Sequence, residues 1–306
     1  MATTSHIRAS IFLGSFDFVI TLAMFNLLSF FSRPLRRRWF YPLLSLVVAL
    51  GISVGSPRSQ AIPLPELILR GVQVIQLSNV SDKQEVQLGK QINQQLLSRE
   101  FKLYRNSDVN RYVDQIGQRL VPNSARPNIP YTFQVVENDS VNAFATMGGF
   151  VYVTTGLMKT ADNEAELASV IGHEIGHIAS RHAVEQMRET AIASGVASVA
   201  GLDRNAVANI GVELALRRPH SRQDEFEADR TGLKTVTGAG YAQSAMISFL
   251  EKLKGSGSVP SFLSTHPATG DRIAALKRAI DSQKANVGEG LDTATYKAQI
   301  RPLSQS

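Results

Sequence analysis

Two histidines and a glutamate near the middle of the chain have the types and spacing to do chemistry: His173, Glu174 and His177 form the pattern H-E-x-x-H. On a helix, residues four apart differ by about 40° around the axis, so both imidazoles can hold one zinc ion. Glu174 stands beside them, where it can take a proton from a water molecule on that zinc. The pattern predicts a hydrolase with one Zn²⁺ per chain, on condition that the segment is helical and that a third ligand comes from elsewhere.

The residues after the motif exclude one arrangement of the third ligand. A metzincin has glycine three positions and histidine six positions after the second motif histidine, whereas this chain has Ser180 and Ala183 there. His182 misses by one position, and on a continuous helix it lies about 180° from His173. We therefore expect His182 to face away from the metal, as a surface or core histidine.

A later acidic segment supplies the best candidate for the third ligand. Glu225 and Asp229 are four residues apart in a helical stretch, so their side chains point the same way. Glu225 would complete a His-His-Glu zinc site, and Asp229 would hold a ligand imidazole by its other nitrogen. The alternative is an acidic helix face exposed to solvent, which is the commoner reason for such a run. The motif upstream favours the ligand.

Two further histidines have less certain roles. His266 lies in a loop rich in Gly, Ser and Pro at 255–270, just before a predicted helix. It is either a helix-capping loop residue or a group that approaches the open zinc position, where it would stabilise the oxyanion or mask the metal at rest. His220, between Pro219 and Ser221, is interpreted as structural.

The composition excludes several other kinds of site. The 306-residue chain contains no cysteine, so disulfides, thiolate zinc ligands and cysteine nucleophiles are excluded. Its formal charge of +6 comes from the N-terminal part: residues 1–61 hold six arginines and one acid, and residues 62–306 hold 26 basic and 25 acidic side chains. A nearly neutral body without a basic stripe argues against nucleic-acid binding.

The N-terminal 61 residues have the pattern of a leader. Three arginines at 36–38 precede an apolar stretch at 39–54, and small residues, Ser59 and Ala61, follow it. We expect cleavage after Ala61 and an exported body, periplasmic or membrane-associated and facing away from the cytoplasm. The alternative is an uncleaved anchor, with the apolar run at 11–31 as an additional span, although the stretch before Ala61 is shorter than the roughly 20 residues that a span needs.

The body is predicted to be an α+β domain, mostly helical with a small mixed sheet or hairpin. Apolar residues recur at helical spacing in some segments and alternate in others. After a linker at 62–80, we expect helices at about 81–98, 107–120, 162–187, 221–236, 241–254 and 271–283, a strand at 131–136 and a hairpin at 141–155. The motif thus lies on the predicted helix at 162–187, with Asp162 as its cap.

Two segments of the body are less regular. The apolar segment at 190–216 is rich in small residues and is interpreted as two packed helices, with a lipid-facing pair as the alternative. Residues 286–306 are expected to form a flexible tail.

Four spaced motifs together resemble one family. They are His173-Glu-Ile-Gly-His177 with Arg181-His182-Ala183, the hairpin with Asn142-Ala-Phe-Ala145, Glu225-Phe-Glu-Ala-Asp229, and His266-Pro-Ala-Thr-Gly-Asp-Arg272. The set is similar to the HtpX/BepA/Oma-type zinc peptidases, peptidase family M48, and the resemblance covers about residues 81–285. It implies a zincin-like metallopeptidase domain of the soluble exported branch with a gluzincin site: His173, His177 and Glu225 on zinc, Glu174 as base and Asp229 behind the ligands.

These observations predict a zinc-dependent endopeptidase. An edge strand of the hairpin, with Asn142, Ala143, Phe144 and Ala145, would hold a polypeptide through main-chain hydrogen bonds, which read shape rather than sequence. Unfolded, misfolded or damaged exported proteins are then the expected substrates, in envelope protein quality control. Two alternatives stay open: a chaperone-like or assembly factor that uses the zinc domain mainly for binding, and a zinc hydrolase that does not act on peptides.

Overall fold

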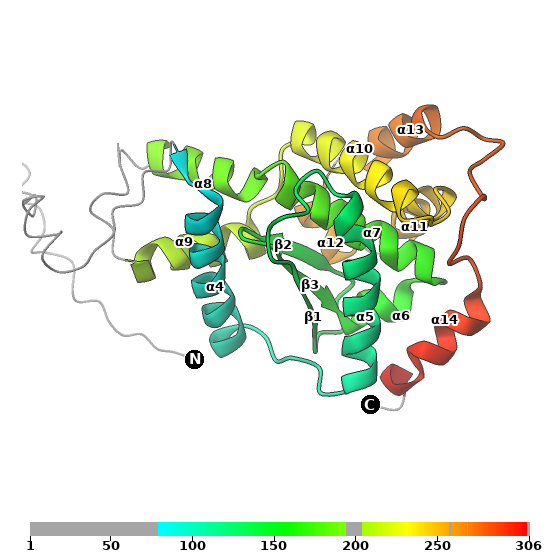
Figure 1. Ribbon diagram of the computed structural model, residues 1–306, viewed down its shortest axis with the longest axis horizontal. Coiled ribbons are helices and arrows are strands. Elements are labelled where there is room, and N and C mark those ends of the chain that lie inside the picture. Colours follow the sequence, from blue (N-terminus) through cyan, green and yellow to red (C-terminus); the bar gives the residue numbers. More distant parts are fainter. Residues whose placement is uncertain (1–78, 194–203, 257–258, 268, 305–306) are drawn as a thin grey trace, which may run out of the picture. The chain divides into compact units, whose positions relative to one another are not determined.

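The computed structural model describes residues 79–193, 204–256, 259–267 and 269–304. The predicted leader at 1–61 and nearly all of the linker at 62–80 lie outside the described residues, as does the middle of the segment at 190–216. Within the described ranges, no helix is both long and apolar enough to cross a membrane. Figure 1 shows a small sheet with helices on both of its faces.

Two helices precede the sheet, α4 (Asp82–Arg99) and α5 (Ser107–Leu120). α4 begins with a capping box: Ser81 Oγ accepts from the backbone N–H of Gln84, and Gln84 Oε1 accepts from the backbone N–H of Ser81. α5 begins after Asn106, whose side chain accepts two backbone N–H groups of the first turn. Both predicted helices are confirmed.

Three strands form one mixed sheet in the order β1–β3–β2: β1 (Thr132–Val136), β2 (Ala143–Thr146) and β3 (Phe150–Thr154). β3 pairs parallel with β1 and antiparallel with β2, so the predicted strand and hairpin are confirmed and β2 is an outer strand. Gly148 and Gly149 form the hairpin turn with φ of 79° and 95°, values that favour glycine. Short helical segments follow α5 and β3, namely η3 (Val121–Asn123) and α6 (Thr155–Thr160).

The sheet separates two apolar clusters, because successive side chains of a strand face opposite sides. From β3, Val151 and Val153 join the cluster that contains the buried face of α5. Tyr152 joins the cluster that contains the buried face of α4. The first cluster also contains most of the apolar side chains of the motif helix, so that helix is held against the sheet.

The motif lies on α7 (Glu164–Ala179), as predicted, but the bounds of this helix differ from the prediction. Asn163, rather than Asp162, is the N-cap. The helix ends at Ala179 instead of continuing to about residue 187, and α8 (His182–Ala193) begins as a separate helix.

Arg181 produces this break. Its φ of 61° lies in the left-handed region, which costs a residue other than glycine about 1–2 kcal/mol. Two contacts with the start of α4 hold it there: Arg181 Nε lies 3.2 Å from Glu85 Oε2, and Arg181 Nη2 donates to the carbonyl of Val80. Glu85 is buried and also pairs with Arg126 at 2.9 Å. The end of α7 therefore depends on a carboxylate that is distant in the sequence.

The C-terminal half consists of helices, most of them near their predicted positions: α9 (Arg204–Arg217), α10 (Arg222–Gly238), α11 (Ser244–Gly255), α12 (Ser261–Thr265) and α13 (Thr269–Ala279). α9 packs against α4 and α8. α9 lies within the predicted helix pair at 190–216, of which residues 194–203 lie outside the described residues. α12 is a short helix within the predicted loop at 255–270, because Pro260 precedes its first turn and buried Phe262 anchors it in the core.

The described residues after 286 differ from the predicted flexible tail. They include α14 (Thr293–Gln299) and a 3₁₀ turn, η5 (Arg301–Ser304). Tyr296, Ile300 and Leu303 are buried in the core, and the Tyr296 hydroxyl donates to the carbonyl of Met158 at 2.7 Å. The segment is ordered because three apolar side chains at helical spacing pack onto the domain.

α7 and α10 cross at close range, and this crossing brings the motif next to the acidic segment. A methyl group on Gly176 would lie 2.6 Å from the carbonyl oxygen of Ala228, and one on Gly232 would lie 2.9 Å from the carbonyl oxygen of Gly172. Real side chains do not approach backbone so closely. Glycine at these positions is therefore a condition for the observed distance between the two helices.

Replacing Gly176 with alanine is expected to lower the free energy of unfolding by about 1–3 kcal/mol, because the added methyl group pushes the helices apart. Equilibrium unfolding in urea measures the effect. Gly255→Ala is the matched control, since an added Cβ there meets no atom within 4 Å, and it should change the free energy by less than about 1 kcal/mol. Equal effects of the two substitutions would contradict this account of the crossing.

A candidate metal centre

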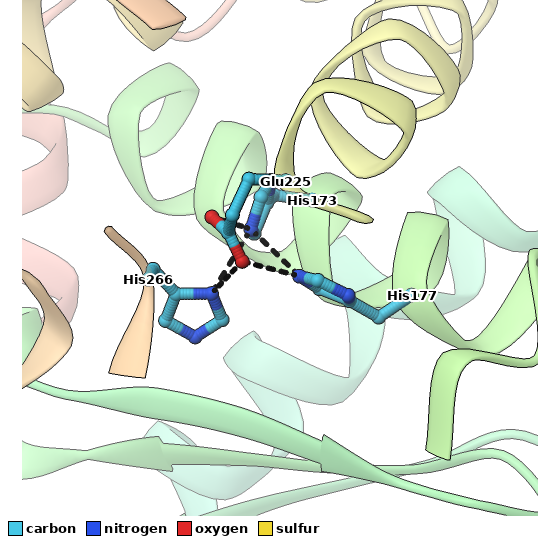
Figure 2. Close-up of side chains that lie close together, drawn as sticks. All are labelled: His173, His177, Glu225 and His266. Carbon is cyan, nitrogen blue, oxygen red and sulfur yellow. Dashed lines mark hydrogen bonds and ion pairs between the residues drawn. The ribbon is translucent and has the colours of Figure 1, made fainter. Parts of the chain in front are cut away.

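Four buried side chains from three helices converge on one point (Figure 2). His173 and His177 come from α7, Glu225 from α10 and His266 from the C-cap of α12. Each exposes 3% of its surface or less. The structure thus brings together the two motif histidines, the acid predicted as third ligand and His266, for which an approach to the metal was one of two interpretations.

The distances between the donor atoms suit one small metal ion. His173 Nε2 lies 3.0 Å from His177 Nε2 and 3.3 Å from His266 Nδ1. Glu225 Oε1 lies 3.3 Å from His177 Nε2 and 3.0 Å from His266 Nδ1. Four ligands placed tetrahedrally at the zinc bond length of about 2.0–2.1 Å stand about 3.3–3.4 Å apart. The four donor atoms, all nitrogen or carboxylate oxygen, therefore fit a single divalent metal.

Glu174 lies beside this cluster and is fully buried. Neither of its carboxylate oxygens has a hydrogen-bond donor among the described residues. The ring of His266 faces it, with Nε2 at 3.5 Å from Glu174 Oε1. Burial raises the pKa of Glu174 above its usual value. A buried carboxylate without a hydrogen-bond donor is available to accept a proton from a group inside the cluster.

Asp229 holds the nitrogen of His173 that points away from the cluster. Asp229 Oδ1 lies 2.9 Å from His173 Nδ1, which is the contact predicted from the sequence. Because an ionised carboxylate can only accept, the ring proton of His173 lies on Nδ1 and Nε2 is presented to the cluster.

Arg272 compensates the charge of two buried carboxylates. Its Nε and Nη2 donate to the two oxygens of Asp229 at 2.7 Å each, and its Nη1 lies 2.5 Å from Glu225 Oε2. Burial alone would raise the pKa of Asp229, but the guanidinium outweighs it and the pKa lies below its usual value. Sequence reasoning gave Arg272 no role. The sequence did contain a signal for this role: Arg272 belongs to the same motif as His266. A site that buries several carboxylates together needs a buried cation.

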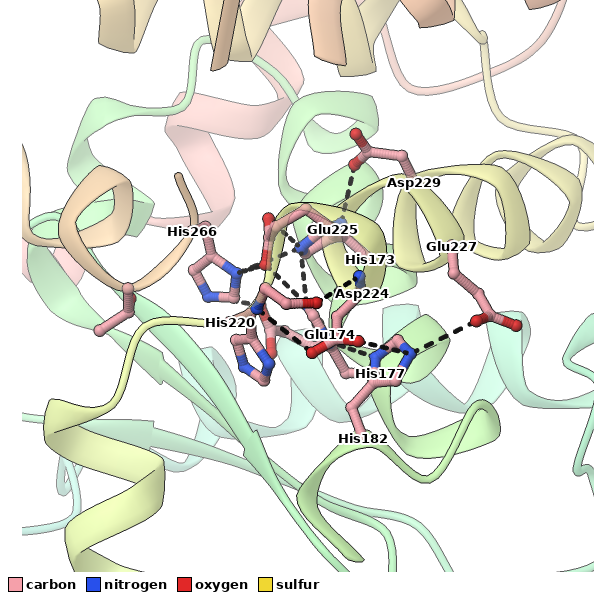
Figure 3. Close-up of polar contacts among 12 residues, drawn as sticks. His173, Glu174, His177, His182, His220, Asp224, Glu225, Glu227, Asp229 and His266 are labelled. Atoms are coloured by element: carbon pink, nitrogen blue, oxygen red, sulfur yellow. Dashed lines mark hydrogen bonds and ion pairs between the residues drawn. The ribbon is translucent and has the colours of Figure 1, made fainter. Parts of the chain in front are cut away.

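His182 is a buried histidine outside the four-residue cluster, as predicted, but it does not face away from the site, because α7 ends before reaching it. Its Nδ1 lies 2.8 Å from Nδ1 of His177, directly behind the cluster (Figure 3). His220 is also close: its ring stacks on that of His177 with 3.9 Å between centroids, and its Nδ1 lies 2.9 Å from Gln186 Nε2. Burial lowers the pKa of His220 to about 3, so this ring is neutral.

The predicted substrate-binding residues lie on and beside β2. Ala143 and Phe144 are buried, and the Phe144 ring stacks on that of Tyr152 with 4.6 Å between centroids. The carbonyl of Asn142 accepts from the backbone N–H of Thr154 at 3.1 Å. Any contribution of this strand to substrate binding therefore comes from its main chain, and that role stays a prediction.

Comparison with known proteins places these features in a family. The family model described as Peptidase family M48 matches residues 107–280. The beta-barrel assembly-enhancing protease of Escherichia coli (strain K12) is 30% identical over 243 residues, which are 74% of this chain and 50% of that protein. The mitochondrial metalloendopeptidase OMA1 of Schizosaccharomyces pombe is 28% identical over 173 residues, 54% of this chain and 51% of that protein. The chain spans about half the length of these curated relatives.

Replacing Arg272 with methionine is expected to lower the unfolding free energy of the metal-free protein by about 3–5 kcal/mol, because two buried carboxylates lose their cation. Denaturant unfolding in the presence of a chelator measures it. Arg222→Met is the control, since Arg222 pairs with Asp271 on the surface at 3.0 Å, and such pairs contribute less than about 1 kcal/mol. A loss below 1 kcal/mol for Arg272→Met would show that the carboxylates do not depend on it.

Proposed function

Because this chain belongs to peptidase family M48, we propose that it is a zinc metalloendopeptidase with a gluzincin site. The observation that carries the proposal is the spacing of the four donor atoms next to a buried carboxylate without a hydrogen-bond donor. His173, His177 and Glu225 are the proposed protein ligands, and Asp229 orients His173. Nitrogen and oxygen donors that all lie within 4.8 Å of one another, in a chain without cysteine, favour zinc over softer metals.

The protein residues divide the work of peptide hydrolysis between them. A bound zinc ion would supply a Lewis acid that polarises the scissile carbonyl and activates water. Glu174 takes the proton of the attacking water and passes it to the leaving amine. Its burial suits this role, because a raised pKa brings a carboxylate closer to the proton affinity that such a transfer needs. Asp229 keeps the ring of His173 in one tautomer throughout.

His266 is proposed to mask the site at rest. Its Nδ1 stands at a ligand position, 3.3 Å from His173 Nε2 and 3.0 Å from Glu225 Oε1, and its Nε2 faces Glu174. Four protein donors make a closed set, which is typical of structural zinc sites, whereas a catalytic site keeps one position open. His266 must therefore withdraw before a substrate carbonyl can enter. This geometry favours masking over a role in binding the oxyanion.

Polypeptides are the proposed substrates. β2 is an outer strand next to the cluster, and the extended segment from Asn142 to Ala145 could pair with a substrate by main-chain hydrogen bonds. Recognition of this kind requires an extended chain, so unfolded or damaged proteins are the best candidates. The proposed setting is quality control of exported proteins. The name of the Escherichia coli relative, a beta-barrel assembly-enhancing protease, supports an action on protein substrates.

The alternative is a chaperone-like or assembly factor that uses the same domain mainly to bind. Such a factor has no need of Glu174, which is buried at an energetic cost and pairs with no hydrogen-bond donor among the described residues. This carboxylate is the observation that favours an enzyme.

Glu174→Gln is expected to lower the rate of peptide-bond hydrolysis by a factor of about 10² to 10⁴, because the amide cannot accept the proton. Cleavage of an unfolded polypeptide followed by mass spectrometry gives the rate, and elemental analysis should show an unchanged zinc content. Glu251→Gln, an exposed surface change on α11, is the control. If the Glu174→Gln protein cleaves nothing but keeps its function in cells, the chain acts mainly by binding. If it cleaves as fast as the parent, Glu174 is not the general base.

The proposed export of this protein leads to a separate prediction about its mature N-terminus. The arginines at 36–38, the apolar stretch at 39–54 and the small residues before position 62 are the observations that motivate it. N-terminal sequencing of the protein purified from its own host should find Ile62 first. An intact leader on the mature protein would leave only the anchored alternative, and a cytoplasmic fraction with an intact leader would remove export altogether.

A further inference from the structure

The ring of His182 lies directly behind that of His177, on the side away from the cluster. His182 is 5% exposed, and its Nδ1 lies 2.8 Å from Nδ1 of His177. Two ring nitrogens at this distance share one proton: one nitrogen carries it and the other accepts it. The direction of this hydrogen bond therefore defines the tautomer of both rings.

The other nitrogen of His177 decides the direction. His177 Nε2 faces the cluster, 3.0 Å from His173 Nε2 and 3.3 Å from Glu225 Oε1. A neutral imidazole that offers Nε2 to a metal carries its proton on Nδ1. That proton points at His182 Nδ1, so His182 is the acceptor and has its own proton on Nε2.

The surroundings of His182 Nε2 suit a proton at that atom. Glu227 Oε2 lies 3.6 Å away and Asp224 Oδ1 lies 3.9 Å away, both on α10 (Figure 3). These distances exceed a direct hydrogen bond, but two nearby carboxylates favour an N–H over an exposed lone pair. The two ends of the His177–His182 pair thus require the same pair of tautomers.

We propose that His182 is a positioning residue that fixes His177 with Nε2 toward the metal; this rests on the proposed role of His177 as a ligand. The two motif histidines are then held by different acceptors: Asp229 for His173 and a neutral imidazole for His177. The break at Arg181 makes this contact available, because on a continuous helix a residue five positions later lies about 140° from the first.

Two substitutions at His182 separate the hydrogen bond from packing. Asparagine places Oδ1 near the position of the histidine Nδ1 and can still accept, whereas leucine fills the space without an acceptor. His182→Leu is expected to weaken zinc binding by about 10–100-fold at unchanged one-to-one stoichiometry, and His182→Asn to keep the dissociation constant within about threefold. Competition with a chromophoric chelator measures both constants. Glu185→Gln, exposed on the same helix, is the control and should change nothing.

The outcomes of this titration are distinguishable. A dissociation constant for His182→Leu within threefold of the parent overturns the proposal, as does a His182→Asn protein as weak as His182→Leu. Loss of all zinc binding by His182→Leu, as expected for His173→Ala, would make His182 a ligand instead. If His173→Ala and the parent bind zinc alike, the proposed metal site itself fails and not the positioning role alone.

The unaltered protein provides a second measurement, which decides the question if the leucine variant does not fold. Nitrogen-15 spectra of the histidine rings in the zinc-loaded protein report which nitrogen carries each proton. We expect His177 protonated on Nδ1, and His182 protonated on Nε2 with a bare Nδ1. A proton on Nδ1 of His182 would overturn the inference. In His182→Leu, the signal of the His177 Nδ1 proton should shift or broaden by exchange.

Discussion

Burying a carboxylate in an apolar interior is costly, and this centre buries three of them, Glu174, Glu225 and Asp229. Arg272 offsets that cost for two of them, because one guanidinium with 1% exposure contacts both Glu225 and Asp229. Glu225 also lies within contact distance of two imidazoles, at 3.0 Å from His266 Nδ1 and 3.3 Å from His177 Nε2. Only Glu174 keeps two oxygens without a hydrogen-bond donor among the described residues. The electrostatic balance thus leaves a single carboxylate free, and it is the one that the chemistry needs.

Backbone features distant from the reacting atoms set the geometry of this balance. The glycines at the crossing of α7 and α10 bring Glu225 and Asp229 within reach of the motif histidines. At the other end of α7, Arg181 stops the helix and returns the chain, so that His182 lies under His177. In both places the backbone adopts a conformation, or approaches another backbone to a distance, that most residue types could not accept. The metal centre therefore depends on local sequence choices that contain no metal ligand.

Local and periodic features could be predicted from the sequence. The four-residue spacing within His173–His177 and within Glu225–Asp229 placed each pair on one face of a helix, and the capping box at Ser81 marked the start of α4. The mostly helical α+β fold with a small mixed sheet is confirmed, and membership of peptidase family M48 confirms its zincin-like class.

The predictions failed where contacts between residues distant in the sequence determine the local structure. No glycine or proline marks the end of α7, because Arg181 takes its left-handed conformation through contacts with Val80 and Glu85. The position of His182 followed from that end and was wrong with it. Arg272 could not be assigned without knowing which acids are buried together. The C-terminal segment is a different case: Tyr296, Ile300 and Leu303 recur at helical spacing, so the signal for a packed helix was present in the sequence.

The central claim is that Glu225 and His266 join His173 and His177 around one zinc ion in the resting protein. X-ray absorption at the zinc edge tests it directly, by counting the imidazoles bound to zinc in the parent and in His266→Ala. The account predicts only nitrogen and oxygen ligands at about 2.0–2.1 Å, with three imidazoles in the parent and two in the variant. An equal count of imidazoles in the two proteins would contradict it.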